Sequence, residues 1–395
     1  MGRNRQRTHF GRTMKTAGST LPLSPHAQRG ECAPCAEQVQ IDCHENEVPA
    51  FAAADIDRLY GHLYCSPRYF EMAGALAGAS CYVARCDGKV VAVLPYRRTR
   101  DEVSVVSEYL TLDAAEIERF CRHMFSRYPS VRRVTFPKVH ANLDALELPR
   151  HAMVCSEDMV VPLPETVKDY ENAVGKNMRR NIKRYSSALL KAFPTYRYEL
   201  HLERDISEQD VRDIIALSCM RMRSKNIVPR FDDTEIDWIA AFARTSGIVG
   251  LARIDGKVCA GAIGFRIGDS YFMHVIAHHP QYNDYSLGIL CYYHTICEGI
   301  ARGGKRFHLL QGRYGYKYRL LAQRRDIHHL DIYRSRLAVL ASLAHIARKE
   351  ARGRLWLTKQ WLLHDLEHKE GRGYRLLARA VNFLRRAKRS KGAME

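Results

Sequence analysis

The sequence predicts an α+β protein built from two tandem copies of one mixed-sheet unit with flanking helices, followed by a basic helical extension. An internal repeat predicts the duplication, because residues 84–90 read Ala-Arg-Cys-Asp-Gly-Lys-Val and residues 252–258 read Ala-Arg-Ile-Asp-Gly-Lys-Val. In both copies an Asp-Gly pair joins two strand-like runs, which is a strong hairpin signal. The length of 395 residues and the hydrophobic content of 46% are ample for two domains with separate cores.

The predicted elements follow the same order in both copies. In the first copy the hairpin precedes a third strand near 102–110, a helix near 114–127 and a strand at 131–136. In the second copy the strands near 249–254, 258–267 and 270–276 precede a helix near 286–302, a strand at 306–310, a short helix near 314–322 and a last strand at 327–333. A strand at 196–203 and two helices, capped by Ser207 and by the cluster at 232–234, come before the second hairpin.

Composition and charge divide the chain into four predicted segments. These are a flexible basic tail (1–50), a first half (51–165), a second half (166–335) and a basic amphipathic helical extension (336–395). The formal net charge is +19, and most of it lies at the two ends, while the body is nearly neutral. Basic ends suit anionic lipid or RNA, whereas a neutral body argues against nucleic-acid binding as the main function. Without a long apolar run or a secretory signal, we expect a cytoplasmic protein.

Cysteine use predicts reduced thiols and no metal ion. Most of the twelve cysteines lie inside apolar strand or helix patterns, where a thiol behaves as a small hydrophobic group. Cys32 and Cys35 form a C-x-x-C motif followed by Cys43 and His44, which would suit a metal or redox cluster. No second pair at zinc spacing follows, so we expect no metal site there.

The element order resembles that of the GNAT acetyltransferases. The tandem pair with a basic helix between the copies resembles the Fem-type peptidoglycan-bridge transferases and the related CelD-like branch, over about residues 55–335. The resemblance implies an acyltransferase of the N-acetyltransferase type. It would take acyl-CoA or acetyl-CoA as co-substrate and act on an amine or hydroxyl of a small or envelope-precursor acceptor. Alternatives are a Fem-like transferase that uses aminoacyl-tRNA and a noncatalytic membrane-associated scaffold.

The second copy carries the predicted donor site. Its connection at 277–285 is long enough for backbone N–H groups to face a pyrophosphate, whereas the first copy has only residues 111–113, with Asp113 capping the positive helix end. The first copy is therefore expected to be structural or to bind the acceptor. The second-copy segment resembles the family's loop-to-helix segment in position, which implies donor binding by Tyr285, Ser286, Leu287, Gly288 and Ile289. The signature Gln/Arg-x-x-Gly-x-Gly/Ala is absent, which leaves the aminoacyl-tRNA alternative open.

Residues 309–319 resemble the family's strand followed by Gly-x-x-x-Tyr-Lys, which lies beside the thioester. Acyl transfer needs an acid for the departing thiolate, and Tyr316 or Tyr318 would supply its proton. Lys317 and Arg313 are predicted to bind phosphate or carboxylate on a substrate. His274 is the candidate base on the third strand, with His278 and His279 in the following loop. The alternatives are tyrosines that pack under the sheet, a structural strand histidine and a water chain as base.

Two basic segments are candidate binding surfaces. In the helix between the halves, Lys176, Arg180 and Lys183 recur at three- and four-residue spacing and are predicted to bind an anionic substrate; a solvated face is the alternative. The extension beyond residue 335 combines leucines, Trp356 and Trp361 with many basic residues. This pattern suits an amphipathic helix on an anionic membrane, and packing onto the transferase body is an equally good interpretation.

Overall fold

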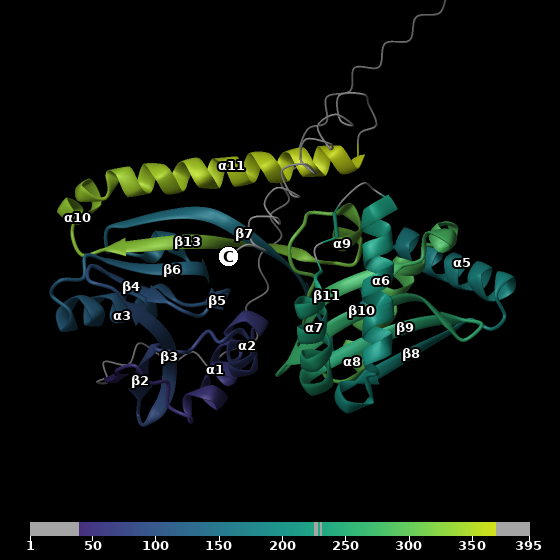
Figure 1. Cartoon of the computed structure of the whole chain (residues 1–395), viewed down its shortest axis with the longest axis horizontal. Coiled ribbons are helices and arrows are strands. Elements are labelled where there is room, and N and C mark those ends of the chain that lie inside the picture. The colour runs from purple at the N-terminus through teal and green to yellow at the C-terminus, as the bar shows by residue number, and fades with distance from the viewer. Residues whose placement is uncertain (1–38, 225–227, 230, 369–395) are drawn as a thin grey trace, which may run out of the picture.

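The computed structural model describes residues 39–224, 228–229 and 231–368. One mixed sheet of thirteen strands runs through both halves of the molecule (Figure 1), in the order β1-β2-β3-β4-β6-β13-β7-β12-β11-β10-β9-β8, with β5 paired to β6. This confirms the predicted α+β class with a mixed sheet and flanking helices.

The first half contains β1 (Gln40–His44), α1 (Ala52–Tyr60), the 3-10 helix η1 (Leu63–Cys65), α2 (Pro67–Ala73), β2 (Ser80–Cys86), β3 (Lys89–Arg98), β4 (Glu102–Val105), β5 (Leu110–Thr111), α3 (Ala114–Arg127), β6 (Arg133–His140), η2 (Leu143–Ala145) and β7 (Arg150–Pro162). The second half contains α4 (Val167–Ala173), α5 (Lys176–Ala192), β8 (Arg197–Leu202), η3 (Glu203–Asp205), α6 (Glu208–Ser224), α7 (Asp233–Ser246), β9 (Gly247–Ile254), β10 (Lys257–Ile267), β11 (Ser270–His278), η4 (Pro280–Tyr285), α8 (Leu287–Ala301), β12 (Arg306–His308), α9 (Gly315–Arg319) and β13 (Gln323–Tyr333). Helices α10 (Arg336–Ala341) and α11 (Leu343–His368) follow.

The repeated Asp-Gly pairs form equivalent tight turns. Asp87 and Gly88 have φ values of 50° and 73°, and Asp255 and Gly256 have values of 51° and 76°. Two successive residues with positive φ are typical of the type I′ turn, whose twist matches that of the strands it joins. The two hairpins, β2–β3 and β9–β10, confirm the predicted repeat.

Two of the predicted helix caps, at Asp113 and Asp232, are present, and the cap at Ser207 stays a prediction. Asp113 accepts a hydrogen bond from the Glu116 N–H at 2.6 Å at the start of α3, and Asp232 accepts one from the Glu235 N–H at 2.8 Å at the start of α7. A carboxylate therefore covers the positive end of α3, as expected for a half that binds no phosphate at this position.

The two halves exchange strands at the centre of the sheet. β13, the last strand of the second half, pairs antiparallel with both β6 and β7 of the first half. β7 in turn pairs with β12 of the second half, at Val160–Pro162. The sheet is therefore continuous across the junction, and the strand predicted to complete the second copy lies among strands of the first.

One correction concerns the N-terminal segment. Residues 40–44, predicted as part of a flexible tail, form the edge strand β1, which pairs antiparallel with β2. The physical reason is a period-two pattern, because Val39, Ile41 and Cys43 pack against the core of the first half.

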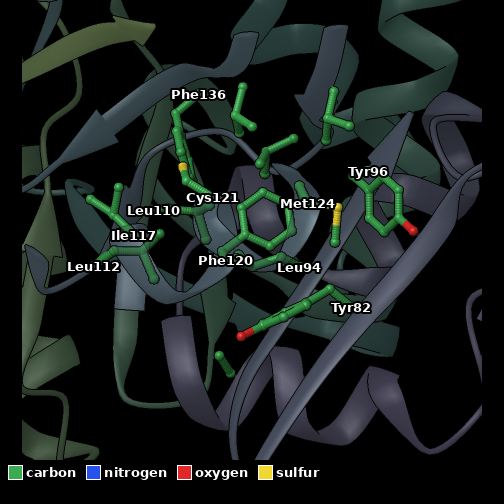
Figure 2. Packing of buried hydrophobic residues seen from close by; sticks show 14 of the residues in the cluster. Tyr82, Leu94, Tyr96, Leu110, Leu112, Ile117, Phe120, Cys121, Met124 and Phe136 are labelled. Atoms are coloured by element: carbon green, nitrogen blue, oxygen red, sulfur yellow. The ribbon is translucent and has the colours of Figure 1, made fainter. Parts of the chain in front are cut away.

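Separate cores support the two halves. In the first half, Figure 2 shows Phe120 of α3 surrounded by side chains of the sheet, with the Tyr82 ring edge-on at a centroid distance of 5.0 Å. In the second half, α6 and α7 cover one face of the sheet around Phe265, and α8 covers the other face around Ile296. Both α8 and the strands beside it are thus fixed by packing, which gives the site described next a rigid base.

Candidate active site

The strands β11 and β12 separate after a short paired stretch. They pair in parallel only where Ser270–Phe272 faces Arg306–His308. Beyond this point β11 continues to His278 beside β10, while the chain leaves β12 and bonds to β7 through the Leu309 N–H and the Met159 carbonyl, at 2.7 Å. An opening between two parallel strands results, with one edge of β11 facing it.

A β-bulge marks β11 at this opening. In the ladder between β10 and β11, Ile263 pairs with Val275 and Gly264 with Met273, so His274 is the extra residue. A bulge bends its strand and redirects the extra side chain, and bulges are frequent next to active sites. The bulge accounts for the position of His274 at the opening.

The opening holds a cavity of about 280 Å³. Its walls come from β11, from α8, from the segment that follows β12, from α9, and from the first half of the chain. The lining residues are Tyr64, Tyr109, Met273, His274, Ile276, Tyr292, Leu309, Leu310, Gln311, Tyr314, Tyr316 and Lys317. Predicted residues His274, Tyr316 and Lys317 are therefore brought together, whereas Tyr318 and Arg313 are not among the lining residues.

Phenolic side chains dominate one wall of the cavity. The hydroxyls of Tyr316 and Tyr292 are 3.3 Å apart, and the ring of Tyr314 stacks on that of Tyr316 at 5.8 Å. Burial, together with the neighbouring Tyr316, raises the pKa of Tyr292 well above its ordinary value, so this phenol keeps its proton at neutral pH. Tyr318 is 46% exposed on the other side of α9.

Lys317 has a different role from the predicted one. Its side chain is buried, and its ammonium donates hydrogen bonds to the carbonyls of Leu309, Leu310 and Gln311 at 2.7, 3.2 and 2.6 Å. Burial lowers the pKa of this ammonium to about 8. Because all three of its hydrogens are used, Lys317 holds the segment after β12 in place instead of presenting a free charge to a substrate.

The first half also holds this segment. The side-chain amide of Gln311 donates to the hydroxyls of Tyr109 and Ser156 at 2.9 and 3.0 Å. Glu157 accepts from the Gly312 N–H at 3.3 Å and forms an ion pair with Arg313. Arg313, predicted to bind a substrate anion, is thus paired with a protein carboxylate.

Positive φ values occur at two residues that line the cavity and at the residue before α8. Tyr109 and Leu310, which line the cavity, have φ values of 59° and 54°, and Ser286 before α8 has 49°. Positive φ in a residue with a side chain is costly and is often found at functional sites. Gly312 has φ 101°, and a Cβ there would lie 2.5 Å from the Tyr314 ring.

The predicted donor-binding residues lie at the start of α8. The connection expected to be a loop is mostly the 3-10 helix η4, which begins after His279. Leu287 is fully buried, and Tyr285 packs edge-on against Phe193 at 5.4 Å. A Cβ on Gly288 would lie 2.8 Å from Nδ1 of His278, so glycine lets that imidazole approach the helix. Ile289 packs partly buried in the core below α8.

Cations from two helices gather near this helix end. The side chain of Tyr185 on α5 is hydrogen-bonded to that of Ser286. This hydrogen bond and the neighbouring Arg184 lower the pKa of the Tyr185 phenol, and Arg319 of α9 makes a smaller contribution. The predicted substrate-binding residues Lys176, Arg180 and Lys183 are exposed on α5 and are not part of the cavity wall.

A buried cluster of His62, Asp158 and His308 lies at the junction of the halves. Asp158 accepts a hydrogen bond from Nδ1 of His308 at 2.6 Å, and Nε2 of His62 is 3.8 Å from the same oxygen. The neighbouring imidazoles hold the pKa of Asp158 well below its usual range against the opposing effect of burial, and burial lowers the pKa of His62 to about 4. Tyr109 contacts both regions, because its ring stacks on His62 at 5.1 Å and lines the cavity.

The surroundings of this cluster disfavour a metal ion, although its three ligand atoms lie within 4.8 Å of one another. Arg306 and Arg325 line the space beside the cluster. The Asp158 carboxylate also attracts the Lys317 ammonium, an effect that raises the pKa of this lysine against the larger effect of burial. Three cations around one carboxylate would repel a divalent ion. We interpret the cluster as a buried polar contact between β7, β12 and the residue before η1, with one hydrogen bond, between His308 and Asp158. The predicted C-x-x-C pair, Cys32 and Cys35, lies outside the described residues, and the Cys43 thiol is 3.4 Å from Nε2 of His123.

Comparison with known proteins gives one family match and several similar solved structures. Residues 176–318 match the family model of the acetyltransferase (GNAT) domain. Among solved structures, FemX has a TM-score of 0.53 at 8% identity, covering 75% of this chain and 97% of FemX. L-PGS from Bacillus licheniformis has a TM-score of 0.45 at 10% identity, covering 78% and 98% of the two chains. A tandem GNAT protein from the clavulanic acid pathway has a TM-score of 0.37 at 11% identity, covering 74% and 98%. No curated protein matches the sequence.

The match to the acetyltransferase (GNAT) domain spans residues 176–318, which contain the separated strands β11 and β12. The likeness to FemX extends over both halves of the chain and is a likeness of fold. Among the described residues, no helix combines the length and the apolar character needed to cross a membrane.

Proposed function

We propose that the protein transfers an acyl group from a thioester donor, acyl-CoA or a similar molecule, directly to an amine or hydroxyl of a small or cell-envelope-related acceptor. The observation that carries this proposal is the cavity between β11 and the segment that follows β12, which is lined by His274 of the bulge and by Tyr316 of α9. The acyl thioester would lie in this cavity, beside the edge of β11 that no longer pairs with β12.

The start of α8 supports an anionic donor tail. Backbone N–H groups at a helix N-terminus favour negative charge, and Arg184 and Arg319 add cations beside Tyr185 and Ser286. In the first half, α3 takes the place of α8, and its N-terminus is capped by Asp113, whose carboxylate would repel a phosphate. The donor is therefore assigned to the second half alone.

The chemistry follows from the groups that line the cavity. A neutral amine attacks the thioester carbonyl carbon, so that a C–N bond forms and the C–S bond breaks. His274 takes the proton that the amine loses, and the Tyr316 phenol gives its proton to the departing thiolate. Tyr292, held protonated by burial, lies next to Tyr316 and is placed to donate a hydrogen bond to the phenolate that remains.

The first half is assigned to the acceptor. Tyr64 of η1 and Tyr109, which precedes β5, bring aromatic surface and hydroxyl groups to the cavity. An acceptor that enters between the halves would meet the thioester without crossing the donor tail. This assignment agrees with the absence of a phosphate-binding helix end in that half.

The test is thiol release from acyl-CoA in the presence of amine and hydroxyl acceptors, with Tyr316→Phe compared with Tyr318→Phe. Both variants remove one hydroxyl from α9, but only Tyr316 lines the cavity. We expect Tyr316→Phe to lower kcat by about a hundredfold and Tyr318→Phe to leave it within about twofold. Equal activity of both variants and the wild type would contradict the role of Tyr316, and no thiol release with any acceptor would contradict the thioester donor.

A further inference from the structure

We infer that the outer face of α10 and α11 binds the surface of an anionic lipid membrane. Helix α11 lies along the outside of the molecule, across β7 and β13 (Figure 1). One side of the helix is bonded to the sheet, and the opposite side carries exposed leucines and arginines. The inference is independent of the proposed acyl transfer.

The inner side of α11 is fixed to the transferase body. Lys349 forms an ion pair of 2.8 Å with the fully buried Asp331 of β13, and Glu350 pairs with His151 of β7 at 2.9 Å. Gly353 is buried, and a Cβ there would lie 2.5 Å from the Met153 side chain. These contacts hold the helix in one rotation about its axis, so its other face is held outward.

The outward face is apolar along its length. Leu343, Ala347, Ala351 and Leu355 follow one another at four-residue spacing, and all four are exposed. Leu343 and Leu355 are 54% and 70% exposed, and Leu337 and Leu340 on α10 are 77% and 60% exposed. Single exposed leucines are ordinary, but a row of them on a rigid outer helix is a pattern of interaction sites.

Positive charge accompanies these leucines. Arg336, Arg348, Arg352 and Arg354 are exposed on the same two helices. Glu350 is the one acidic residue in the sequence between Asp331 and Asp365, and its carboxylate contacts the imidazole of His151. The face is therefore strongly cationic as well as apolar.

This combination fits a lipid surface better than the two other candidate partners. Leucines enter the boundary between headgroups and acyl chains, while arginines pair with anionic headgroups and extend their apolar stems along the helix. RNA would use the arginines but leave the leucines in water. A second copy of this face would bring like charges together, because both surfaces carry arginines.

The experiment is sedimentation of the full chain with vesicles of phosphatidylcholine alone and with phosphatidylglycerol added. We expect binding to the anionic vesicles, at least tenfold weaker binding to neutral ones, and a similar loss in high salt. The double variant Leu343→Gln, Leu355→Gln should weaken binding about tenfold, and Arg348→Glu, Arg352→Glu should weaken it at least as much.

Matched controls lie elsewhere on the surface. Leu190→Gln with Met220→Gln replaces apolar side chains that are 50% and 42% exposed, and Arg100→Glu with Arg244→Glu makes the same change in net charge. Both controls should bind as the wild type does. The inference is overturned if the controls and the α11 variants behave alike, if vesicles are not bound, or if the leucine variant instead abolishes a dimer in light scattering. Binding to RNA that is lost only in the arginine variant would also overturn it.

Discussion

The ammonium of Lys317 lies 2.6 Å from the carbonyl oxygen of Gln311 and also bonds to the carbonyls of Leu309 and Leu310. Lys317→Met would keep much of the side-chain volume and leave these buried carbonyls without their donor. We expect the free energy of unfolding to fall by about 3 kcal/mol, because unsatisfied buried acceptors are costly. Chemical denaturation measures the change, with Lys305→Met, at a 73% exposed lysine, as a control that should change little. A loss of activity without loss of stability would contradict this structural role and favour substrate binding.

Gly312 tests the backbone of the same segment. With φ of 101° and only 2.5 Å between an added Cβ and the Tyr314 ring, Gly312→Ala should lower stability by about 2 kcal/mol and displace Tyr314 in the cavity. Gly315→Ala, where an added Cβ meets nothing within 4 Å, should be nearly neutral. Thermal unfolding and turnover of both variants check this, and equal effects would show that the segment adapts to a side chain.

His274 is expected to act on the acceptor's proton. His274→Gln should lower kcat/KM by about a hundredfold at neutral pH, with a smaller deficit at alkaline pH, where more of the acceptor amine is already neutral. His279→Gln, which changes the residue before η4, is the control and should retain activity. A deficit that is independent of pH would indicate that His274 shapes the bulge instead of accepting a proton.

The buried His62 predicts a loss of stability in mild acid. Its pKa in the folded protein is about 4, below the ordinary value of about 6.5, because burial disfavours the charged imidazole. At a pH between these two pKa values the unfolded chain binds more protons than the folded protein. The free energy of unfolding therefore falls as pH falls, by about 3 kcal/mol at most. In His62→Gln the slope of stability against pH should be smaller, whereas His201→Gln, outside the cluster, should keep it. An unchanged slope in His62→Gln would show that other groups cause the acid dependence.

Local signals in the sequence predicted most of the elements. The duplicated Asp-Gly turns, the helix caps at Asp113 and Asp232 and the order of the second half all depend on neighbouring residues, and the structure contains them. The exchange of β7 and β13 depends on pairing between strands more than 150 residues apart, for example Asp326 with Glu157. No local pattern encodes such a partner.

For the candidate site, local signals in the sequence indicated a segment of the chain but not which of its residues line the cavity. The predicted motif from Gly312 to Lys317 contributes Tyr314, Tyr316 and Lys317 to the cavity wall. Which face of α9 lies inside depends on burial, and this separates Tyr316 from the exposed Tyr318. Sequence analysis missed Tyr292, which lies on α8, and it missed Tyr64 and Tyr109, which belong to the other half of the chain. The position of Asp158 beside His308 follows from the strand exchange, so sequence analysis missed that cluster as well.

The most direct test of the account is the thermal midpoint of the full chain with CoA, with acetyl-CoA and with a long-chain acyl-CoA. A ligand at a hundred times its Kd stabilises the folded state by about 2.7 kcal/mol, so a donor that occupies the cavity should raise the midpoint clearly. We predict a rise with at least one acyl-CoA that exceeds the rise with CoA, because the acyl group adds contacts in the cavity. No rise with any thioester would contradict the proposed donor, and a rise with aminoacyl-tRNA alone would assign the cavity to the tRNA-dependent reaction.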